Sequence, residues 1–467
     1  MTTLWSGRFD TAPDAAAFDF GASFRFDRRL FEDDVTGSMA WARALGRGGV
    51  LPADEVSRIE GALGDLLERG RSDPAFVSGA DEDVHTFVER LLVERLGDSG
   101  RRLHTGRSRN EQVSLDLRLY LRRRIPALQR AIASVIDGLA VRADEAGDAL
   151  MPAFTHFRPA QPVLVAHFLL AHVAPLRRDH DRLARACDEA NALPLGSGAI
   201  AGTSYPIDVK LLATDLGFDR VVANSIDASS DRDFAASFLY AAALTMVHLS
   251  RLAEDLIILC GDEHRFFEFS DALSTGSSMM PQKKNPDPLE LVRGKTGRSI
   301  ADLLALLTTM KGIPSGYNKD LQEDKHAVFD SEDTVAGCLA VVKSVVGGLT
   351  LNRERAARAA SGQLLATDVA DYLVGKGMPF RSAHEVVGAL VRKLVAEGRE
   401  FGSLSIAEWR AASELFEPDV LNRVTPEASV RAKQTPQSTA PSAVSAAMAD
   451  VDRWLATTLL PLENQLC

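Results

Sequence analysis

The sequence predicts an all-α protein built around a bundle of long helices. Apolar residues recur at helical spacing over several stretches that are long for a globular protein. One of them, residues 231–260, is apolar on most of its faces, as in Phe-Ala-Ala-Ser-Phe-Leu-Tyr-Ala-Ala-Ala-Leu. A helix of this kind must be surrounded by other helices. Because no stretch shows a convincing strand pattern, we expect a helical bundle that continues across an interface between subunits.

Five long helices are expected in this bundle. Their approximate ranges are residues 110–145, 162–190, 231–260, 289–310 and 325–349. Pro126 predicts a kink in the first helix. Residues 229–231, Ser-Ser-Asp, are candidate caps for the third helix. Gly312 and Pro314 follow the fourth helix and are expected to end it.

Shorter helices are expected on both sides of the bundle. Glycines and prolines such as Pro74 and Pro379 interrupt the helical pattern in these regions. We therefore divide the chain into an N-terminal helical domain, residues 1–106, a central long-helix bundle, residues 107–351, and a C-terminal helical domain, residues 352–467.

The charge balance argues against nucleic acid and membranes as partners. Asp and Glu number 64 against 53 Lys and Arg, and aromatic residues make up 6%. A nucleic-acid partner usually needs a basic face. The longest apolar stretch contains Arg251, Glu254 and Asp255, which are too polar for a membrane span. The N-terminus has no basic segment followed by an apolar core, and we expect a cytoplasmic protein.

Residues 274–290, Ser-Thr-Gly-Ser-Ser-Met-Met-Pro-Gln-Lys-Lys-Asn-Pro-Asp-Pro-Leu-Glu, are the most informative part of the chain. Three prolines, Gly276 and the tandem serines predict an irregular loop. Lys283 and Asn285 supply donors, and the serines supply hydroxyl groups. A helical pattern follows, so the loop ends at a helix N-terminus, which favours anions. The segment suits a small carboxylate substrate.

Polar segments that stand near predicted helices are further candidates for a binding site. They are residues 81–85, Asp-Glu-Asp-Val-His, residues 104–110, His-Thr-Gly-Arg-Ser-Arg-Asn, residues 155–162, Thr-His-Phe-Arg-Pro-Ala-Gln-Pro, and residues 317–325, Tyr-Asn-Lys-Asp-Leu-Gln-Glu-Asp-Lys. Arg107 and Arg109 precede a long helix, where positive charge is disfavoured unless an anion is present. They therefore indicate an anion site. Residues 196–202 are rich in glycine, but their spacing does not fit nucleotide binding.

Residues 274–290 resemble the signature of the fumarase/aspartase superfamily, and the form Gln-Lys-Lys-Asn-Pro-Asp resembles its argininosuccinate lyase branch. The four polar segments resemble the same branch, and weaker matches lie at residues 4–9, at Ser23 with Asp27, and at residues 370–384. The resemblance implies a three-domain all-helical fold, a homotetramer with active sites shared between subunits, and no metal or organic cofactor. The implied reaction is the reversible β-elimination of argininosuccinate to L-arginine and fumarate in arginine biosynthesis.

The resemblance also implies roles for particular residues. The catalytic residues would be Ser277, His156, Lys283 and Glu290, and the substrate-binding residues would be Ser23, Asp83, His85, Arg109, Asn110, Thr155, Asn285, Tyr317, Gln322 and Lys325. Ser277 is assigned as the base, with its alkoxide stabilised by Lys283, and His156 as the acid, assisted by Glu290. Ser278 is the competing serine, and the reverse assignment, with His156 as the base, stays open. Arg158 stands where relatives usually carry glutamine.

Other functions remain as alternatives at this point. Fumarase, aspartase and adenylosuccinate lyase fit the Arg107 and Arg109 segment and the Gln-Lys-Lys loop less well. A catalytically silent structural relative, like the δ-crystallins, is a candidate from a different class. The joint presence of the four catalytic candidates argues against lost activity.

Overall fold

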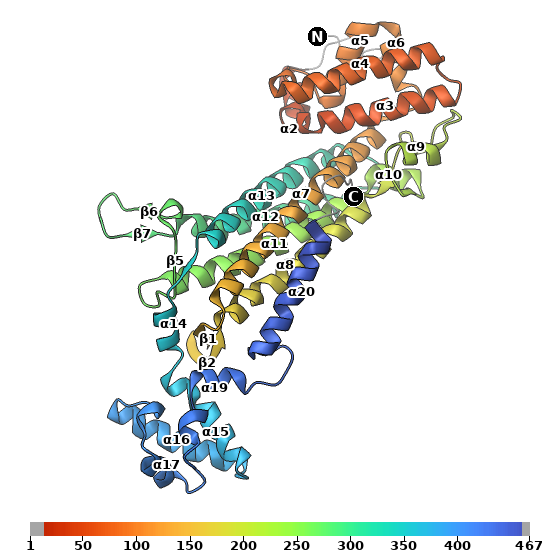
Figure 1. Ribbon diagram of the computed structural model, residues 1–467. Coiled ribbons are helices and arrows are strands. Elements are labelled where there is room, and N and C mark those ends of the chain that lie inside the picture. Colours follow the sequence, from red (N-terminus) through yellow and green to blue (C-terminus); the bar gives the residue numbers. More distant parts are fainter. Residues whose placement is uncertain (1–13, 460–467) are drawn as a thin grey trace.

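The computed structural model describes residues 14–459, and most of these residues are helical (Figure 1). The weak match at residues 4–9 lies outside the described residues. Five long helices run side by side in the centre of the molecule: α7 (Arg109–Ala146), α8 (Val165–Ala190), α11 (Asp233–Cys260), α12 (Asp287–Met310) and α13 (Asp324–Gly347). They confirm the predicted all-α bundle, with ends that differ from the predicted ranges by a few residues.

Helix α7 is the axis of this bundle. Ser108 caps its N-terminus, and the Glu111 side chain accepts a hydrogen bond from the Ser108 backbone N–H at 3.0 Å, which completes a capping box. The helix is 38 residues long in total and is not interrupted at Pro126. At 1.5 Å per residue this corresponds to a length of about 57 Å. Helix α7 contacts α8, α13, α3 and α20, so most of its surface is buried.

The N-terminal helices cover one end of the bundle (Figure 1). They are α1 (Ala15–Gly21), α2 (Phe24–Asp27), α3 (Phe31–Arg47), α4 (Ala53–Ser72), α5 (Val84–Leu96) and α6 (Asp98–Arg101). Their buried side chains, among them Trp41 and Leu45, form one continuous apolar core with those of the bundle. The two regions are therefore firmly packed against each other.

The chain beyond the bundle is folded into shorter helices. They are α14 (Arg353–Ala359), α15 (Ala366–Gly375), α16 (Phe380–Glu397), α17 (Ile406–Ala412), α18 (Val420–Arg423), α19 (Pro426–Arg431) and α20 (Pro441–Leu459). Residues 365–424 have their own apolar core around Phe401, Trp409 and Phe416. Helix α20 returns to pack along α7 and α8. We keep the division at residues 106 and 351 as a proposal.

A β-hairpin lies where the sequence suggested only a loop and the start of a helix. Strands β1 (Leu150–Thr155) and β2 (Arg158–Leu164) pair in antiparallel fashion, and α8 begins three residues later than predicted. The expectation of no strands was therefore wrong. Pro159 and Pro162 argued against a strand at β2 in the sequence, but prolines are tolerated on the free edge of a two-stranded sheet.

The remaining elements are short. Strand pairs of two residues each join β3 (Ala192–Leu193) with β4 (Arg220–Val221), β5 (Phe267–Glu268) with β8 (Thr350–Leu351), and β6 (Thr275–Gly276) with β7 (Lys284–Asn285). The short helices are α9 (Val209–Asp215) and α10 (Ser225–Ser230), and the 3-10 helices are η2 (Arg28–Leu30), η3 (Pro74–Phe76), η4 (Arg102–His104), η5 (Asp271–Leu273), η6 (Lys319–Glu323), η7 (Gly362–Leu365) and η8 (Phe401–Ser403). Within residues 14–459, no helix has both the length and the apolar character needed to cross a bilayer.

A buried ion cluster joins α11 to α13, and it yields a stability prediction. Asp324 contacts Arg232 Nε and lies 2.9 Å from Lys325 Nζ, and all three side chains are almost fully buried. Burial acts to raise the pKa of Asp324, but the charges of Lys325 and Arg232 outweigh it and lower the pKa. The carboxylate is therefore ionised at neutral pH, and its stabilising effect is lost as the pH falls through its folded pKa.

Asp324→Asn should lower the free energy of unfolding by about 3–5 kcal/mol at neutral pH, because two buried cations lose their anion. Denaturant unfolding followed by circular dichroism measures the change. The matched control is Asp262→Asn, which breaks an exposed pair with Arg265 and should leave stability nearly unchanged. Equal effects of the two substitutions would contradict a stabilising role for the buried cluster.

Candidate active site

A cavity of about 180 Å³ lies between the N-terminal helices and the adjacent end of the bundle. Its walls are Ser23, Asp27, Glu82, Asp83, His85, Arg109, Asn110, Val113, Tyr317, Lys319, Gln322 and Lys325. Eight of these are substrate-binding residues predicted from the sequence: Ser23, Asp83, His85, Arg109, Asn110, Tyr317, Gln322 and Lys325. Four segments that are far apart in the sequence therefore meet at one place.

The first wall joins the start of α2 to the start of α5. The Ser23 hydroxyl donates to Asp27 Oδ2 at 2.5 Å, and the Val84 backbone N–H donates to Asp27 Oδ1 at 3.0 Å. The Ser23 backbone N–H donates to the Glu82 carbonyl at 2.7 Å. Asp27 is thus both a wall of the cavity and the link between two segments. The sequence indicated it only through its weak match together with Ser23.

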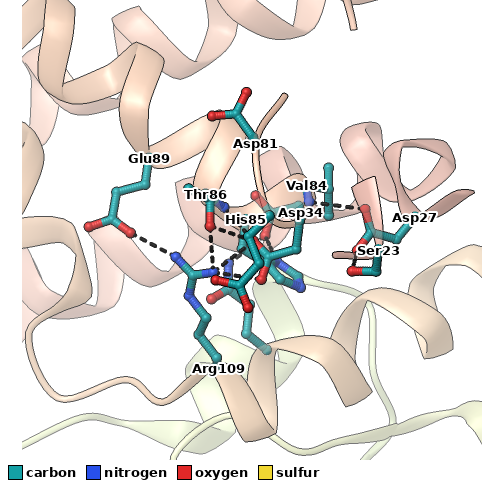
Figure 2. Close-up of polar contacts among 12 residues, drawn as sticks. Ser23, Asp27, Asp34, Asp81, Val84, His85, Thr86, Glu89 and Arg109 are labelled. Carbon is teal, nitrogen blue, oxygen red and sulfur yellow. Dashed lines mark hydrogen bonds and ion pairs between the residues drawn. The ribbon is translucent and has the colours of Figure 1, made fainter. Parts of the chain in front are cut away.

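Arg109 lies in the second wall, between carboxylates of α5 and its N-cap (Figure 2). Its Nη1 donates to both Asp83 oxygens, at 2.7 and 2.8 Å, and to Thr86 Oγ1 at 3.0 Å, while its Nη2 donates to Glu89 Oε2 at 3.1 Å. Burial acts to raise the pKa of Asp83, but His85 and Arg109 outweigh it and lower the pKa to about 2. Asp83 is therefore a permanent carboxylate in this cavity.

The two arginines of residues 104–110 already have partners inside the protein. Arg107 is buried, its Nη1 donates to Ser38 Oγ at 3.1 Å, and Asp34 and Asp116 lie near enough to attract its charge. Arg109 pairs with Asp83 and Glu89. The sequence predicted an anion beside this pair of arginines, and the structure supplies internal carboxylates there. A role for Arg109 toward substrate remains a proposal, based on its place in the cavity wall.

The third wall comes from η6 and the residues around it. Gln322 Nε2 donates to the Gly21 carbonyl at 3.2 Å, and Lys319 Nζ lies 3.5 Å from Glu82 Oε1. Burial raises the pKa of Tyr317 to about 12, so its phenol keeps its proton and remains a donor. Lys319 and Glu82 were not among the predicted residues, although both belong to segments that the sequence singled out.

His156 occupies the tip of the β1–β2 hairpin, away from this cavity. His156 and Phe157 have φ values of 52° and 57°, which is the two-residue turn geometry that normally favours glycine or asparagine. Thr155 pairs with Arg158 across the turn, and all four side chains are exposed. A non-glycine residue with positive φ is strained, and such strain is often found at functional sites.

Ser277 lies in the loop between β6 and β7. Its Oγ accepts hydrogen bonds from the backbone N–H groups of Met279, at 3.3 Å, and Met280, at 3.0 Å. Lys284 anchors the base of the loop, with its Nζ 2.7 Å from Asp271 Oδ1. The side chains of Ser278 and Lys283 are exposed. Lys283 also lines a separate cavity of about 600 Å³ beside the end of α11.

The predicted site residues thus form three groups rather than one. The cavity lies at the N-terminal end of α7, whereas the β1–β2 hairpin follows its C-terminal end, about 57 Å away along the helix. The β6–β7 loop, with Asn285, is also at that far end of the bundle (Figure 1). The predicted contact between Glu290 and His156 is not formed within the described chain. Glu290 instead lies 4.0 Å from Arg293.

The chain is similar to known proteins along nearly its whole length. A family model described as "Lyase" matches residues 7–300, and one described as "Argininosuccinate lyase C-terminal" matches residues 363–431. The chain is 48% identical to the argininosuccinate lyase of Heliobacterium mobile, covering 95% of this chain and 97% of the relative. It is also 48% identical to that of Moorella thermoacetica, covering 95% and 96%.

Solved structures agree with these sequence matches. A crystal structure of EDDS lyase in complex with formate has a TM-score of 0.83 at 26% identity, covering 97% of this chain and 94% of the other. A fumarate lyase from Mesorhizobium sp. BNC1 has a TM-score of 0.74 at 20% identity, covering 90% and 95%, and shows the same fold. The chain therefore belongs to the argininosuccinate lyase family.

Proposed function

We propose that the chain cleaves argininosuccinate reversibly to L-arginine and fumarate, as a step of arginine biosynthesis. The observation that carries this proposal is the single cavity that gathers eight of the predicted substrate-binding residues, in a chain 48% identical to argininosuccinate lyases over nearly its full length. Acidic and basic groups both line the cavity, namely Asp27, Glu82 and Asp83 with Arg109, Lys319 and Lys325. This balance suits a substrate that carries carboxylates as well as cationic nitrogen groups.

The chemistry requires a base and a cluster of donors. The reaction breaks a C–N bond β to a carboxylate, after a proton leaves the carbon next to that carboxylate. This carbon acid is very weak, and proton loss places extra negative charge on the carboxylate. Lys283, Asn285 and the N–H groups of the β6–β7 loop are the donors that we assign to this charge.

Ser277 is the base in this proposal. A serine hydroxyl is a poor base unless its alkoxide is stabilised. The N–H groups of Met279 and Met280 already donate to Ser277 Oγ, and hydrogen bonds of this kind strengthen when the acceptor becomes charged. His156 then protonates the departing guanidino nitrogen, and Glu290 of a neighbouring subunit orients its ring.

The site is assembled between subunits of a homotetramer in this proposal. The cavity, the hairpin and the β6–β7 loop occupy separate places on one chain, so copies of the chain must bring them together. The bundle also carries exposed apolar side chains, with Tyr240 50% exposed on α11, and Ile300, Leu304 and Leu307 47%, 64% and 46% exposed on one face of α12. Such a face is typical of an interface. We further assign the protein to the cytoplasm, without a metal or organic cofactor.

Adding argininosuccinate to the purified protein should produce fumarate, which is followed by its ultraviolet absorbance. Adenylosuccinate and aspartate are the matched control substrates and should give little or no fumarate. Turnover of a control substrate in preference to argininosuccinate would assign the chain to another fumarate-releasing lyase. No turnover of any of them would favour a catalytically silent structural protein.

Ser277→Ala should lower kcat by about 10²–10⁴-fold, the usual contribution of an acid–base group, while argininosuccinate still binds. Ser278→Ala is the matched control and should lose less, since the Ser278 side chain makes no hydrogen bond to the described residues. Stopped-flow turnover and equilibrium binding separate the two effects. A larger loss for Ser278→Ala would move the base by one residue, and small losses for both would transfer proton abstraction to His156.

Mixing the inactive variants His156→Asn and Lys283→Ala after mild dissociation should restore activity, because some mixed sites then receive both native residues. A mixture of Ser277→Ala with Lys283→Ala is the control, since both changes lie in one loop and neither subunit can supply an intact loop. The absence of recovery in the first mixture, with mixed tetramers demonstrated by native mass spectrometry, would argue against shared sites.

A further inference from the structure

Two carboxyl groups that do not line the cavity lie close to the His85 ring. Its Nδ1 lies 2.8 Å from Asp34 Oδ1 on α3 and 3.4 Å from Asp116 Oδ2 on α7. The side chains of His85, Asp34 and Asp116 are only 2%, 1% and 0% exposed. Figure 2 shows Asp34 and His85 within the group of polar side chains around Arg109. This cluster connects the cavity wall to the interior of the protein.

The two carboxyl groups differ in charge. Burial acts to raise the pKa of Asp34, but the hydrogen bond and charge of His85, the charge of Arg107 and a hydrogen bond from Gln112 outweigh it, so the pKa is lowered. Burial and the negative charge of Asp34 together raise the pKa of Asp116 well above its ordinary value. Two buried carboxyl groups that lie next to each other rarely ionise at the same time. Asp34 is thus the carboxylate, and Asp116 is the neutral acid.

Unpaired oxygens in the cluster support the same distribution of charge. Asp34 Oδ2 and both oxygens of Asp116 have no hydrogen-bond donor among the described residues. A proton on Asp116 supplies the donor that these neighbouring acceptors lack. Arg107 then balances the charge of Asp34 within the buried cluster.

The hydrogen bond to Asp34 decides which nitrogen of His85 carries the proton. A carboxylate only accepts, so the contact at 2.8 Å places the proton on Nδ1. The other nitrogen, Nε2, has no hydrogen-bond partner among the described residues, and His85 lines the cavity. In the neutral imidazole, whose single proton is on Nδ1, the lone pair of Nε2 can accept a hydrogen bond from a ligand.

We propose that Asp34 is a positioning residue that holds the proton of His85 on Nδ1, so that Nε2 accepts a hydrogen bond from an N–H group of the substrate. The inference rests on the proposed function, since argininosuccinate carries such donors in its guanidino and ammonium groups. A structural role would only hold α3, α5 and α7 together. The proposed role also controls how the cavity recognises the nitrogen groups of its ligand.

A metal ion is the competing occupant of this cluster. The ligand atoms of Asp34, His85 and Asp116 lie within 4.8 Å of one another, as in a metal site. The guanidinium of Arg107 acts on the same two carboxyl groups, which disfavours a cation there, and a protonated Asp116 is a poor ligand. Metal analysis of the purified protein is therefore part of the test.

The sharpest test compares two substitutions that have the same shape and contact the same ring. Asp34→Asn removes the carboxylate and should raise KM for argininosuccinate at least about tenfold with a smaller change in kcat, the lower end of effects seen for groups that orient a histidine. Asp116→Asn replaces one neutral donor with another and should change KM by less than about threefold. Thermal unfolding verifies that both variants are folded. Equal losses, or a larger loss for Asp116→Asn, would overturn the proposal.

A double-mutant cycle separates positioning from structure. If Asp34 acts through His85, Asp34→Asn should add little to KM in a His85→Gln background, although it still lowers thermal stability. Additive effects on KM would show that Asp34 acts independently of the ring. Stoichiometric metal in the native protein, lost in both Asp→Asn variants, would replace the proposal with a metal site.

Nitrogen NMR of the native protein labelled with ¹⁵N-histidine tests the tautomer without any variant of Asp34. The signals of His85, identified by their loss in His85→Gln, should show a protonated Nδ1 and an unprotonated Nε2. The opposite pattern would overturn the proposal. This measurement does not depend on turnover, so its failure is distinguishable from failure of the proposed function, in which the native protein would not cleave argininosuccinate.

Discussion

Buried charge along α7 is the constraint on which the arrangement of the surrounding segments depends. A charged group in the interior must be paired or hydrogen-bonded, or it destabilises the fold by several kcal/mol. The partners that α7 requires come from distant segments. Arg118 meets Asp231 at the entry to α11, Arg122 donates to the carbonyls of Leu216 and Gly217, and Glu111 accepts from the N–H of Gly198. Each pairing fixes the position of a loop or helix against the bundle.

The cavity is a consequence of these pairings. Two polar contacts connect α3, α5 and the start of α7. Asp34 on α3 contacts His85 on α5, and Arg109 on α7 contacts Asp83 at the start of α5. The walls therefore contain ionised groups whose charges largely balance one another. Such a site is organised before a ligand enters, which suits recognition of a small molecule with several charges of both signs.

The segments that carry the proposed catalytic residues differ from the cavity walls in their exposure. The side chains at the hairpin tip with His156 are exposed, and so are most of those in the loop that holds the half-buried Ser277. Positive φ values at His156 and Phe157 also give the hairpin a strained turn. The tip of the hairpin and the exposed part of the loop are less constrained within a single chain than the walls of the cavity. Contacts with other copies of the chain are the source of rigidity that we propose for them.

The long helices and most of the residues of the cavity could be predicted from the amino-acid sequence alone. Helical periodicity and end signals such as Gly312 and Pro314 after α12 act over a few residues, so they are readable along the chain. The resemblance to a known family also indicated Ser23, His85 and Gln322 as binding residues, and all three line the cavity.

The way in which these segments combine depends on tertiary packing. The β1–β2 hairpin was hidden by its prolines, and the partners of Arg107 and Arg109 proved to be carboxylates of the protein itself. The contact of Asp34 with His85, 51 residues apart, and the separation of His156 from the cavity have no local signal. Packing brings such groups together or keeps them apart, because contacts between distant segments depend on how whole helices stack and not on the spacing of neighbouring residues.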